Sequence, residues 1–247
     1  MPRLGLIGYP LSHSFSPAYF RKKFAALGIS NWSYELFPLA SIDELQPLLG
    51  QNIHGLNVTI PYKTAVLPFC NALSEEAGAT GAVNCLEIEN RDNDLFITGH
   101  NTDVLGFRES LLKWYQPQLR NALIIGNGGS AKAVAYVLKN ENIPFVNVVR
   151  NPTALQHIPF SELSEMSLQP YDLIVNCTPV GMWPHHETIL PFNTNTISSH
   201  HHYYDLIYNP EVTATMQMFA EHGAQVKNGL EMLHLQADKA WHIWSRK

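Results

Sequence analysis

The segment LNVTIPYK, residues 56–63, places a lysine beside polar side chains where a strand is expected to end. Apolar residues alternate there with Asn57 and Thr59, which predicts a strand with one polar face. Pro61 ends that strand and suits the first position of a helix, since this position needs no N–H donor. Lys63 would then lie in the first turn, where the positive end of the helix dipole disfavours a cation. Lys63 is therefore either a solvated surface residue or a cation kept for chemistry.

A glycine-rich loop further along the chain has the spacing of a dinucleotide-binding turn, G-x-G-x-x-A. It follows a predicted strand, 122–126, and opens a predicted helix, 130–139. The glycines allow a tight turn and a close approach of the backbone to a pyrophosphate, which the N–H groups of the helix N-terminus bind. The residues of the loop are Gly126, Asn127, Gly128, Gly129, Ser130 and Ala131.

The strand after this loop ends in VVRN, with a basic residue and no acid. NAD sites place an Asp or Glu about 20 residues beyond the glycines, where it binds the ribose 2′-hydroxyl. Arg150 instead suits a 2′-phosphate, by its charge and by its planar fork of donors. The sequence therefore favours NADP over NAD as the cofactor.

The composition is that of a globular protein. The 247 residues are 45% hydrophobic and 15% charged, and the net charge of -5 argues against a nucleic-acid partner. Three cysteines without CxxC spacing indicate a reducing compartment, and no apolar run reaches membrane-spanning length. Adjacent histidines at 185–186 and 200–202 lack the folded spacing of a metal site, so no metal is expected. We expect a cytoplasmic protein with no membrane contact.

The elements that must position these residues form two alternating series. Strands at 4–8, 32–37 and 56–60 alternate with helices, one opened by Ser16 and Pro17 and one by the capping box of Ser41 and Glu44. This order predicts a parallel sheet, with a hairpin at 82–99 on its edge. A helix at 103–115 leads to a break at Gln116 and Pro117. The second series runs from residue 122 to residue 229, and a final amphipathic helix spans 230–244. The sequence thus predicts two α/β domains.

Eight segments in order resemble shikimate dehydrogenases along nearly the whole chain. They are GYPLSHSFSP (8–17), NVTIPYK (57–63), GAVN (81–84), NTD (101–103), GNGGSA (126–131), NCTPVGM (176–182), YDLIYNP (204–210) and NGLEMLHLQA (228–237). The resemblance implies NADP-linked interconversion of 3-dehydroshikimate and shikimate. It also implies an N-terminal substrate domain with a mainly parallel sheet, residues 1–101 with 229–247, and a Rossmann-like NADP-binding domain, residues 102–228, that flank a cleft.

The resemblance further implies a role for individual residues. Lys63 would be the catalytic lysine, paired with Asp103. The substrate ligands would be Ser14, Ser16, Asn57, Thr59, Asn84, Tyr208 and Gln236. The cofactor would contact the loop 126–131, Arg150, Asn151, Thr178 and Gly229.

Two other functions agree with the same residues. One is a quinate/shikimate dehydrogenase that uses NAD, since the basic residue that often follows Arg150 in this family is missing. The other is a non-catalytic dinucleotide-binding sensor, which the presence of both Lys63 and Asp103 disfavours. The expected partners are a small-molecule substrate and, at most, a second copy of the chain, as a monomer or homodimer.

Overall fold

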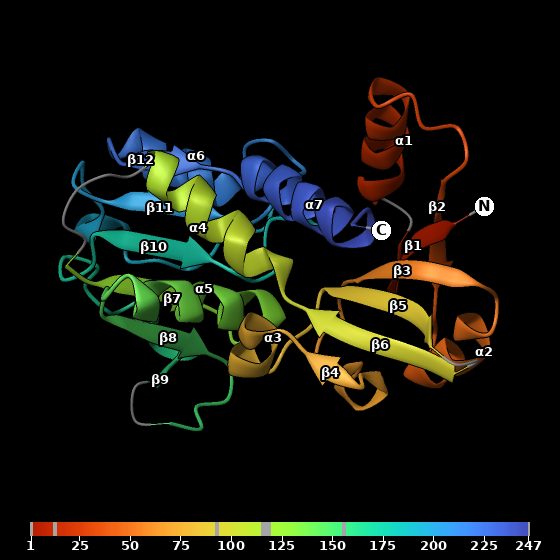
Figure 1. The fold of residues 1–247 in the computed structure, drawn as a ribbon. Coiled ribbons are helices and arrows are strands. Elements are labelled where there is room, and N and C mark those ends of the chain that lie inside the picture. Colours follow the sequence, from red (N-terminus) through yellow and green to blue (C-terminus); the bar gives the residue numbers. More distant parts are fainter. Residues whose placement is uncertain (1, 12–13, 92–93, 115–119, 155–156, 247) are drawn as a thin grey trace. The chain divides into compact units, whose positions relative to one another are not determined.

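The computed structural model describes residues 2–11, 14–91, 94–114, 120–154 and 157–246. The chain divides into two compact units: Met1–Thr102 with Gln236–Lys247 form unit 1, and Asp103–Leu235 form unit 2. Each unit contains one six-stranded sheet (Figure 1), which confirms the α/β class. The middle of the expected hairpin turn 90–94, the break at Gln116 and Pro117, and His13 of the segment 8–17 lie outside the described residues.

The sheet of unit 1 has the strand order β2-β1-β3-β5-β6-β4. Its strands are β1 (Arg3–Gly8), β2 (Ser33–Pro38), β3 (Ile53–Val58), β4 (Ala72–Leu73), β5 (Cys85–Arg91) and β6 (Asp94–His100). The first three are parallel, as predicted, and β5 and β6 form the expected antiparallel hairpin. β4, which the sequence did not predict, pairs with β6 at the sheet edge. The parallel part places the carboxyl ends of β1 and β3 at one edge.

Two of the α-helices described in unit 1 begin at or near the predicted signals, and the third, 75–80, was not predicted. The three are α1 (Ser16–Ala26), α2 (Leu45–Leu49) and α3 (Glu75–Thr80), with 3₁₀ helices at Ile42–Glu44 and Leu67–Phe69. The capping box of Ser41 and Glu44 is confirmed, although it opens the first 3₁₀ helix. The predicted cap at Ser16 is wrong: α1 already includes Ser16, Phe15 is the N-cap residue, and no side chain caps the helix. Pro17 does lie in the first turn, as predicted.

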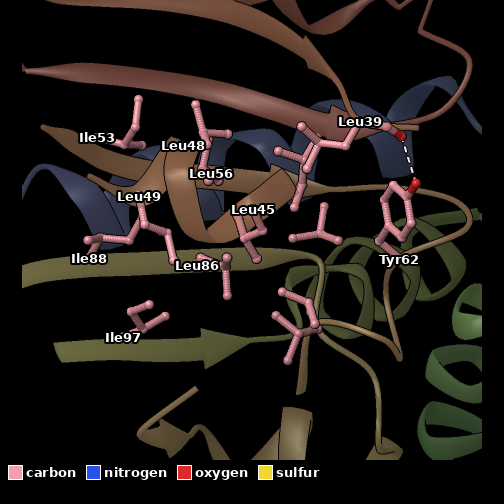
Figure 2. Close-up of a cluster of buried hydrophobic side chains, with 14 of the residues drawn as sticks. Leu39, Leu45, Leu48, Leu49, Ile53, Leu56, Tyr62, Leu86, Ile88 and Ile97 are labelled. Carbon is pink, nitrogen blue, oxygen red and sulfur yellow. Dashed lines mark hydrogen bonds between the residues drawn. The ribbon is translucent and has the colours of Figure 1, made fainter. Parts of the chain in front are cut away.

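Two apolar clusters cover the two faces of this sheet. Because successive side chains of a strand point to opposite faces, Ile7 packs into one cluster and Leu4 into the other. Figure 2 shows the first cluster, in which leucines of α2 pack on β3 and β5, and the Tyr62 hydroxyl donates to the Leu39 carbonyl oxygen (2.6 Å). The second cluster contains Phe20 of α1. With both faces covered, the central strand β1 is buried and apolar after its first residue.

The sheet of unit 2 is entirely parallel, with the strand order β12-β11-β10-β7-β8-β9. Its strands are β7 (Ala122–Ile125), β8 (Phe145–Val149), β9 (His157–Pro159), β10 (Leu173–Asn176), β11 (His202–Asp205) and β12 (Gln225–Lys227). Counted along the chain, this is the order 3-2-1-4-5-6 of a Rossmann sheet, with its switch point between β7 and β10. The predicted Rossmann-like fold is confirmed, and β9 is an unpredicted edge strand.

The helices of unit 2 cover both faces of its sheet. They are α4 (Thr102–Trp114), α5 (Gly129–Asn140), α6 (Ala214–Glu221) and the first part of α7 (Leu230–Trp244), with 3₁₀ helices at Phe160–Glu162 and Thr194–Thr196. α5 buries Ala131, Val134 and Leu138, which share one face at helical spacing. They pack with α4 on one face of the sheet, and Phe219 of α6 packs on the other. The bounds of α7 agree with the prediction, and its residues from Gln236 onward belong to unit 1.

Candidate functional site

In unit 1, a chain of hydrogen bonds joins polar side chains of β2, β3 and α7 with those of two loops. The Tyr34 hydroxyl donates to Asn57 Oδ1 (2.8 Å), and Asn57 Nδ2 donates to the Asn84 carbonyl oxygen (3.3 Å). Asn84 Nδ2 donates to Thr102 Oγ1 (2.9 Å) and to Gln236 Oε1 (3.4 Å). Three predicted substrate ligands thus form one connected set, although 152 positions separate Asn84 from Gln236.

Strand pairing explains why these side chains meet. Asn57 lies near the carboxyl end of β3 and pairs with Cys85, the first residue of the antiparallel neighbour β5. Asn84 directly precedes β5, so it lies at the same edge. Its amide orientation is fixed, because Asn84 Oδ1 accepts the Thr102 N–H (2.6 Å) while Nδ2 faces the Thr102 hydroxyl. The edge therefore presents amides whose donor and acceptor ends are assigned.

Ser14 and Ser16 lie at the start of α1. The Ser16 N–H donates to Ser14 Oγ (3.3 Å), so the two residues form one local turn. The Ser16 hydroxyl also interacts with the Tyr34 phenol, whose pKa burial raises far above its usual range, against a lowering by Ser16. Tyr34 thereby connects the serine turn to Asn57. Hydroxyls in such a turn are suited to a carboxylate ligand, which is the role predicted for both serines.

The predicted helix around Lys63 is wrong. Residues 59–66 contain turns but no helical residue, and the next helical residues are those of the 3₁₀ helix 67–69. The Lys63 carbonyl oxygen accepts the Val83 N–H (2.7 Å), the Leu67 N–H donates to Thr64, and Pro68 has no N–H to continue a helix. The argument from the helix dipole therefore does not apply to Lys63. The bond to Val83 instead ties the lysine backbone to the residue before Asn84.

Asp103 follows two residues that are anchored in unit 1. Asn101 Nδ2 donates to Thr80 Oγ1 (3.0 Å) and to the Ala82 carbonyl oxygen (3.0 Å), and the Thr102 N–H is bonded as described above. Asp103 itself is the acidic residue in the first turn of α4, where the helix dipole stabilises a carboxylate. Its pairing with Lys63 stays a prediction.

In unit 2, the glycine loop joins the carboxyl end of β7 to the N-terminus of α5. Gly126 has φ +113°, and a methyl group built on it would lie 3.3 Å from Thr178 Cγ2, so this position requires glycine. Gly128 is the N-cap of α5 and has open space around a built methyl group. The first turn of α5 contains no acidic residue, and no side chain caps it. Such a helix N-terminus favours an anion.

The other loop residues divide into exposed and packed positions. Asn127 and Gly128 are exposed, while Gly129 and Ser130 are half-buried. Ala131 is buried against the core of unit 2, as the third position of the motif requires for close packing of helix on strand. We therefore expect the first part of the loop to face a pyrophosphate.

Arg150 and Asn151 follow β8, the strand beside β7, and both are exposed. The carboxyl ends of parallel strands lie at one edge of the sheet, so these residues share the edge of the glycine loop. Asn147 Nδ2, from the same strand, donates to the Gly126 carbonyl oxygen (3.1 Å). Arg150 is thus an exposed cation at the sheet edge that carries the glycine loop, called the dinucleotide edge below, and its contact with a phosphate stays a prediction.

Thr178 follows β10, on the other side of β7. Its N–H (2.9 Å) and its hydroxyl (2.7 Å) both donate to Asn176 Oδ1, and its hydroxyl accepts the Val180 N–H (3.3 Å). The Thr178 hydroxyl proton is therefore already used in the bond to Asn176, and the Thr178 methyl group faces Gly126. Thr178 therefore borders the glycine turn, and its contact with the cofactor stays a prediction.

Tyr208 and Gly229 belong to the last third of unit 2. Tyr208 is half-buried and follows β11. Gly229 precedes α7, and a methyl group built on it would lie 2.1 Å from the Leu206 carbonyl oxygen, so close backbone packing explains this glycine. Its N–H donates to the Ile207 carbonyl oxygen (2.9 Å). The contacts of Tyr208 and Gly229 with substrate and cofactor stay predictions.

Sequence reasoning missed several residues that organise these sites. They are Tyr34, Thr102, Asn147, Asn176 and Asp205. Tyr34 lies in the predicted strand 32–37, in which no candidate residue was named, and Thr102 stands between two residues of the NTD segment. Asn176 and Asp205 end two neighbouring apolar strands, and a polar residue in that position is a usable signal for a site at a sheet edge.

Asp205 is the most strongly perturbed carboxyl group of unit 2. It is fully buried, and this burial raises its pKa to about 6, against a lowering by bonds from Ile207, Thr213, Asn176 and Tyr203. In the described parts of the chain, no group of three or more metal-ligating side chains occurs. Nor does any described helix combine the length and the apolar character that crossing a bilayer requires.

Comparison with known proteins places these observations in a family. A family model described as the shikimate dehydrogenase substrate binding domain matches residues 6–86. A shikimate dehydrogenase (NADP(+)) of Clostridium botulinum (strain 657 / Type Ba4) is 37% identical over 97% of this chain and 95% of its own length.

Solved structures of other proteins have the same fold over nearly the full length of this chain. Shikimate 5-dehydrogenase of Thermus thermophilus, in complex with NADP(H) and shikimate, has a TM-score of 0.85 and 29% identity, covering 99% of this chain and 94% of that one. Quinate dehydrogenase of Corynebacterium glutamicum, in complex with NAD, has a TM-score of 0.84 and 28% identity, covering 99% of this chain and 93% of that one. Together with the 37% identity to the Clostridium protein, the polar edge of unit 1 and the Rossmann edge of unit 2 establish that the chain belongs to the shikimate dehydrogenase family.

Proposed function

We propose that this protein is an NADP-dependent shikimate dehydrogenase that interconverts 3-dehydroshikimate and shikimate. The observation that carries the proposal is the connected edge of unit 1, in which Asn57, Asn84 and Gln236 are joined by hydrogen bonds. These are residues that the resemblance assigns to the substrate. The names of the relatives support the same reaction and the same cofactor.

The substrate ligands follow from the chemistry of this edge. Shikimate carries a carboxylate and ring hydroxyls. The hydroxyls of Ser14 and Ser16 bind the carboxylate, and the oriented amides of Asn57 and Asn84 bind ring hydroxyls. Gln236 completes the set, with Thr59 and Tyr208 as further ligands. In this proposal residues 1–101 with 229–247 carry the substrate.

The cofactor site lies in the proposed domain 102–228. The fit rests on a glycine turn at a helix N-terminus without acidic residues, and on an exposed arginine after the neighbouring strand. The turn 126–131 binds the pyrophosphate, Arg150 and Asn151 bind the 2′-phosphate, and Thr178 and Gly229 border the cofactor. An acid that would favour the ribose 2′-hydroxyl of NAD is missing from VVRN.

Reduction of the ketone requires a hydride on carbon and a proton on oxygen. Bound NADPH supplies the hydride. Lys63 donates the proton to the developing alkoxide, and its charge stabilises that oxygen before the proton has moved. In this proposal the Asp103 carboxylate is the partner that would orient the Lys63 ammonium group. In the reverse direction, Lys63 takes the hydroxyl proton as the hydride leaves.

An absorbance assay at the nicotinamide band tests the proposal directly. Shikimate with NADP⁺ should give NADPH, with kcat/KM at least about tenfold above that of quinate or of NAD⁺, because a pocket built for particular hydroxyls rejects their analogues. Higher efficiency with quinate and NAD⁺ would identify the alternative dehydrogenase. Binding of NADP⁺ without any turnover would identify a sensor and contradict the proposal.

The proposal includes a cytoplasmic location, in line with three cysteines that are free thiols. It also includes a small-molecule substrate without a nucleic-acid partner. A monomer and a homodimer are both compatible with it, and light scattering after size-exclusion chromatography distinguishes the two.

A further inference from the structure

A buried polar pair, Asn176 and Asp205, lies at the dinucleotide edge of unit 2 and has no part in the proposed chemistry. The two are the last residues of β10 and β11 and are partners in the parallel register. Neither has any exposed surface (0%). A buried amide and a buried carboxyl group are costly unless their polar atoms are bonded, so their bonds reveal what they hold.

The two oxygens of Asp205 serve different parts of the unit. Oδ1 accepts Asn176 Nδ2 (3.0 Å) and the Ile207 N–H (3.1 Å), and so holds the segments that follow β10 and β11. Oδ2 accepts the hydroxyls of Thr213 (2.8 Å) and Tyr203 (3.3 Å), and Thr213 is the N-cap of α6. All four donors are neutral. One oxygen faces the dinucleotide edge, and the other faces the fold behind it.

The Oδ1 contact decides how Asn176 presents its amide. Because Asp205 accepts hydrogen bonds, Asn176 must turn Nδ2 toward it and Oδ1 away. Asn176 Oδ1 then accepts both the N–H (2.9 Å) and the hydroxyl (2.7 Å) of Thr178. The Thr178 methyl group in turn lies where a methyl group on Gly126 would meet it at 3.3 Å. Hydrogen bonds thus lead from Asp205 through Asn176 to Thr178, whose methyl group borders the space beside the first glycine of the loop.

We propose that Asp205 and Asn176 are positioning residues for NADP: Asp205 orients the Asn176 amide, and Asn176 holds Thr178 as the wall against which the Gly126 turn is set. The inference rests on the proposed use of NADP at this edge. Neither Asp205 nor Asn176 touches the cofactor. What Asn176 needs from Asp205 is an acceptor oxygen, which an asparagine at 205 also supplies.

Calorimetric titration with NADP⁺ tests this inference in the full chain. Asn176→Ala should raise the Kd of NADP⁺ about tenfold, because the Thr178 N–H and hydroxyl lose their acceptor. The KM of shikimate at saturating NADP⁺ should stay within about twofold, since all the proposed substrate ligands except Tyr208 lie in unit 1. Asp205→Asn should keep the Kd of NADP⁺ within about twofold, because asparagine also supplies an acceptor oxygen. This variant therefore tests whether Asn176 needs an acceptor oxygen or a negative charge at position 205.

Thr213→Val is the matched control, because it removes a donor to the other oxygen of Asp205. It should lower the Tm through the lost cap of α6 and leave the Kd of NADP⁺ unchanged. An unchanged Kd in Asn176→Ala, or an equal rise in Thr213→Val, overturns the inference. If Asn176→Ala does not fold, Thr178→Val takes its place: a several-fold rise in Kd supports the inference and an unchanged Kd overturns it. A wild-type protein that binds no NADP⁺ contradicts the proposed function instead.

Discussion

The two candidate sites of this protein are built from different material. In unit 1 the site is a network of neutral side chains that runs from Tyr34 to Gln236 and holds its amides in fixed orientations. In unit 2 the site is a turn of backbone at Gly126, supported from behind by the buried carboxyl group of Asp205. Deletion of single polar groups in unit 1 should therefore weaken substrate binding. In unit 2, cofactor binding should depend on the backbone conformation at Gly126 and its supports, and the stability of the unit should depend on pH.

The largest expected effect concerns the lysine that gives unit 1 its chemistry. Lys63→Ala should lower kcat by about 10³-fold, because the alkoxide loses its proton donor, with a much smaller change in the Kd of NADP⁺. Steady-state kinetics and calorimetry measure the two quantities. Lys22→Ala, at an exposed lysine of α1, is the control and should behave as wild type. Turnover within a few-fold of wild type in Lys63→Ala would remove Lys63 from the mechanism.

The buried carboxyl group should make the stability of unit 2 depend on pH. The pKa of Asp205 is raised from 3.8 to about 6, so its contribution to stability is complete below pH 3.8 and is lost as the pH rises through 6. The loss amounts to about 3 kcal/mol. In urea unfolding between pH 4 and pH 7, the free energy of unfolding of Asp205→Asn should not show this slope, that is, this fall with rising pH. Tyr34→Phe, in the neutral network, should keep the wild-type slope. An equal dependence of the unfolding free energy on pH in wild type and Asp205→Asn would contradict the role of Asp205 in the stability of unit 2.

The backbone turn should tolerate no side chain at its first glycine. Gly126→Ala forces an L-residue to φ +113°, and we expect the Kd of NADP⁺ to rise about tenfold together with a lower Tm. Gly128→Ala is the control for folding, because its built methyl group meets no atom within 4 Å, so its Tm should stay unchanged. A loss of NADP⁺ affinity in Gly128→Ala without a change in Tm would then show that the added methyl group meets the bound cofactor and does not disturb the fold. Unchanged Kd and Tm in Gly126→Ala would show that the turn adapts.

The smallest expected effect is a single hydroxyl in unit 1. Tyr34→Phe leaves Asn57 Oδ1 without its donor and removes the partner of Ser16, so the KM of shikimate should rise about fivefold with an unchanged KM of NADP⁺. Tyr171→Phe, outside both candidate sites, is the matched deletion and should change neither constant. A rise in the KM of NADP⁺ in Tyr34→Phe would mean that the two sites are not independent.

Elements with local signals were predictable. The capping box of Ser41 and Glu44, the glycine loop before α5 and the bounds of α7 were all found from the sequence, because each depends on residues within one or two turns. The prediction of a helix at Pro61 was wrong for the opposite reason, because a contact between distant segments decides the conformation there. Lys63 bonds to Val83, 20 positions away, and that strand-edge contact replaces the local helix.

The sequence by itself determined that the chain alternates strands and helices, that a glycine turn opens a helix, and which motifs resemble the family, since periodicity and short motifs are local. Only the tertiary structure decided that Tyr34 and Thr102 complete the polar set of unit 1, and that Asp205 stands behind the cofactor turn. Those bonds join strands far apart in the chain. Their geometry depends on sheet order and register, which arise from packing of the whole unit and not from any one segment.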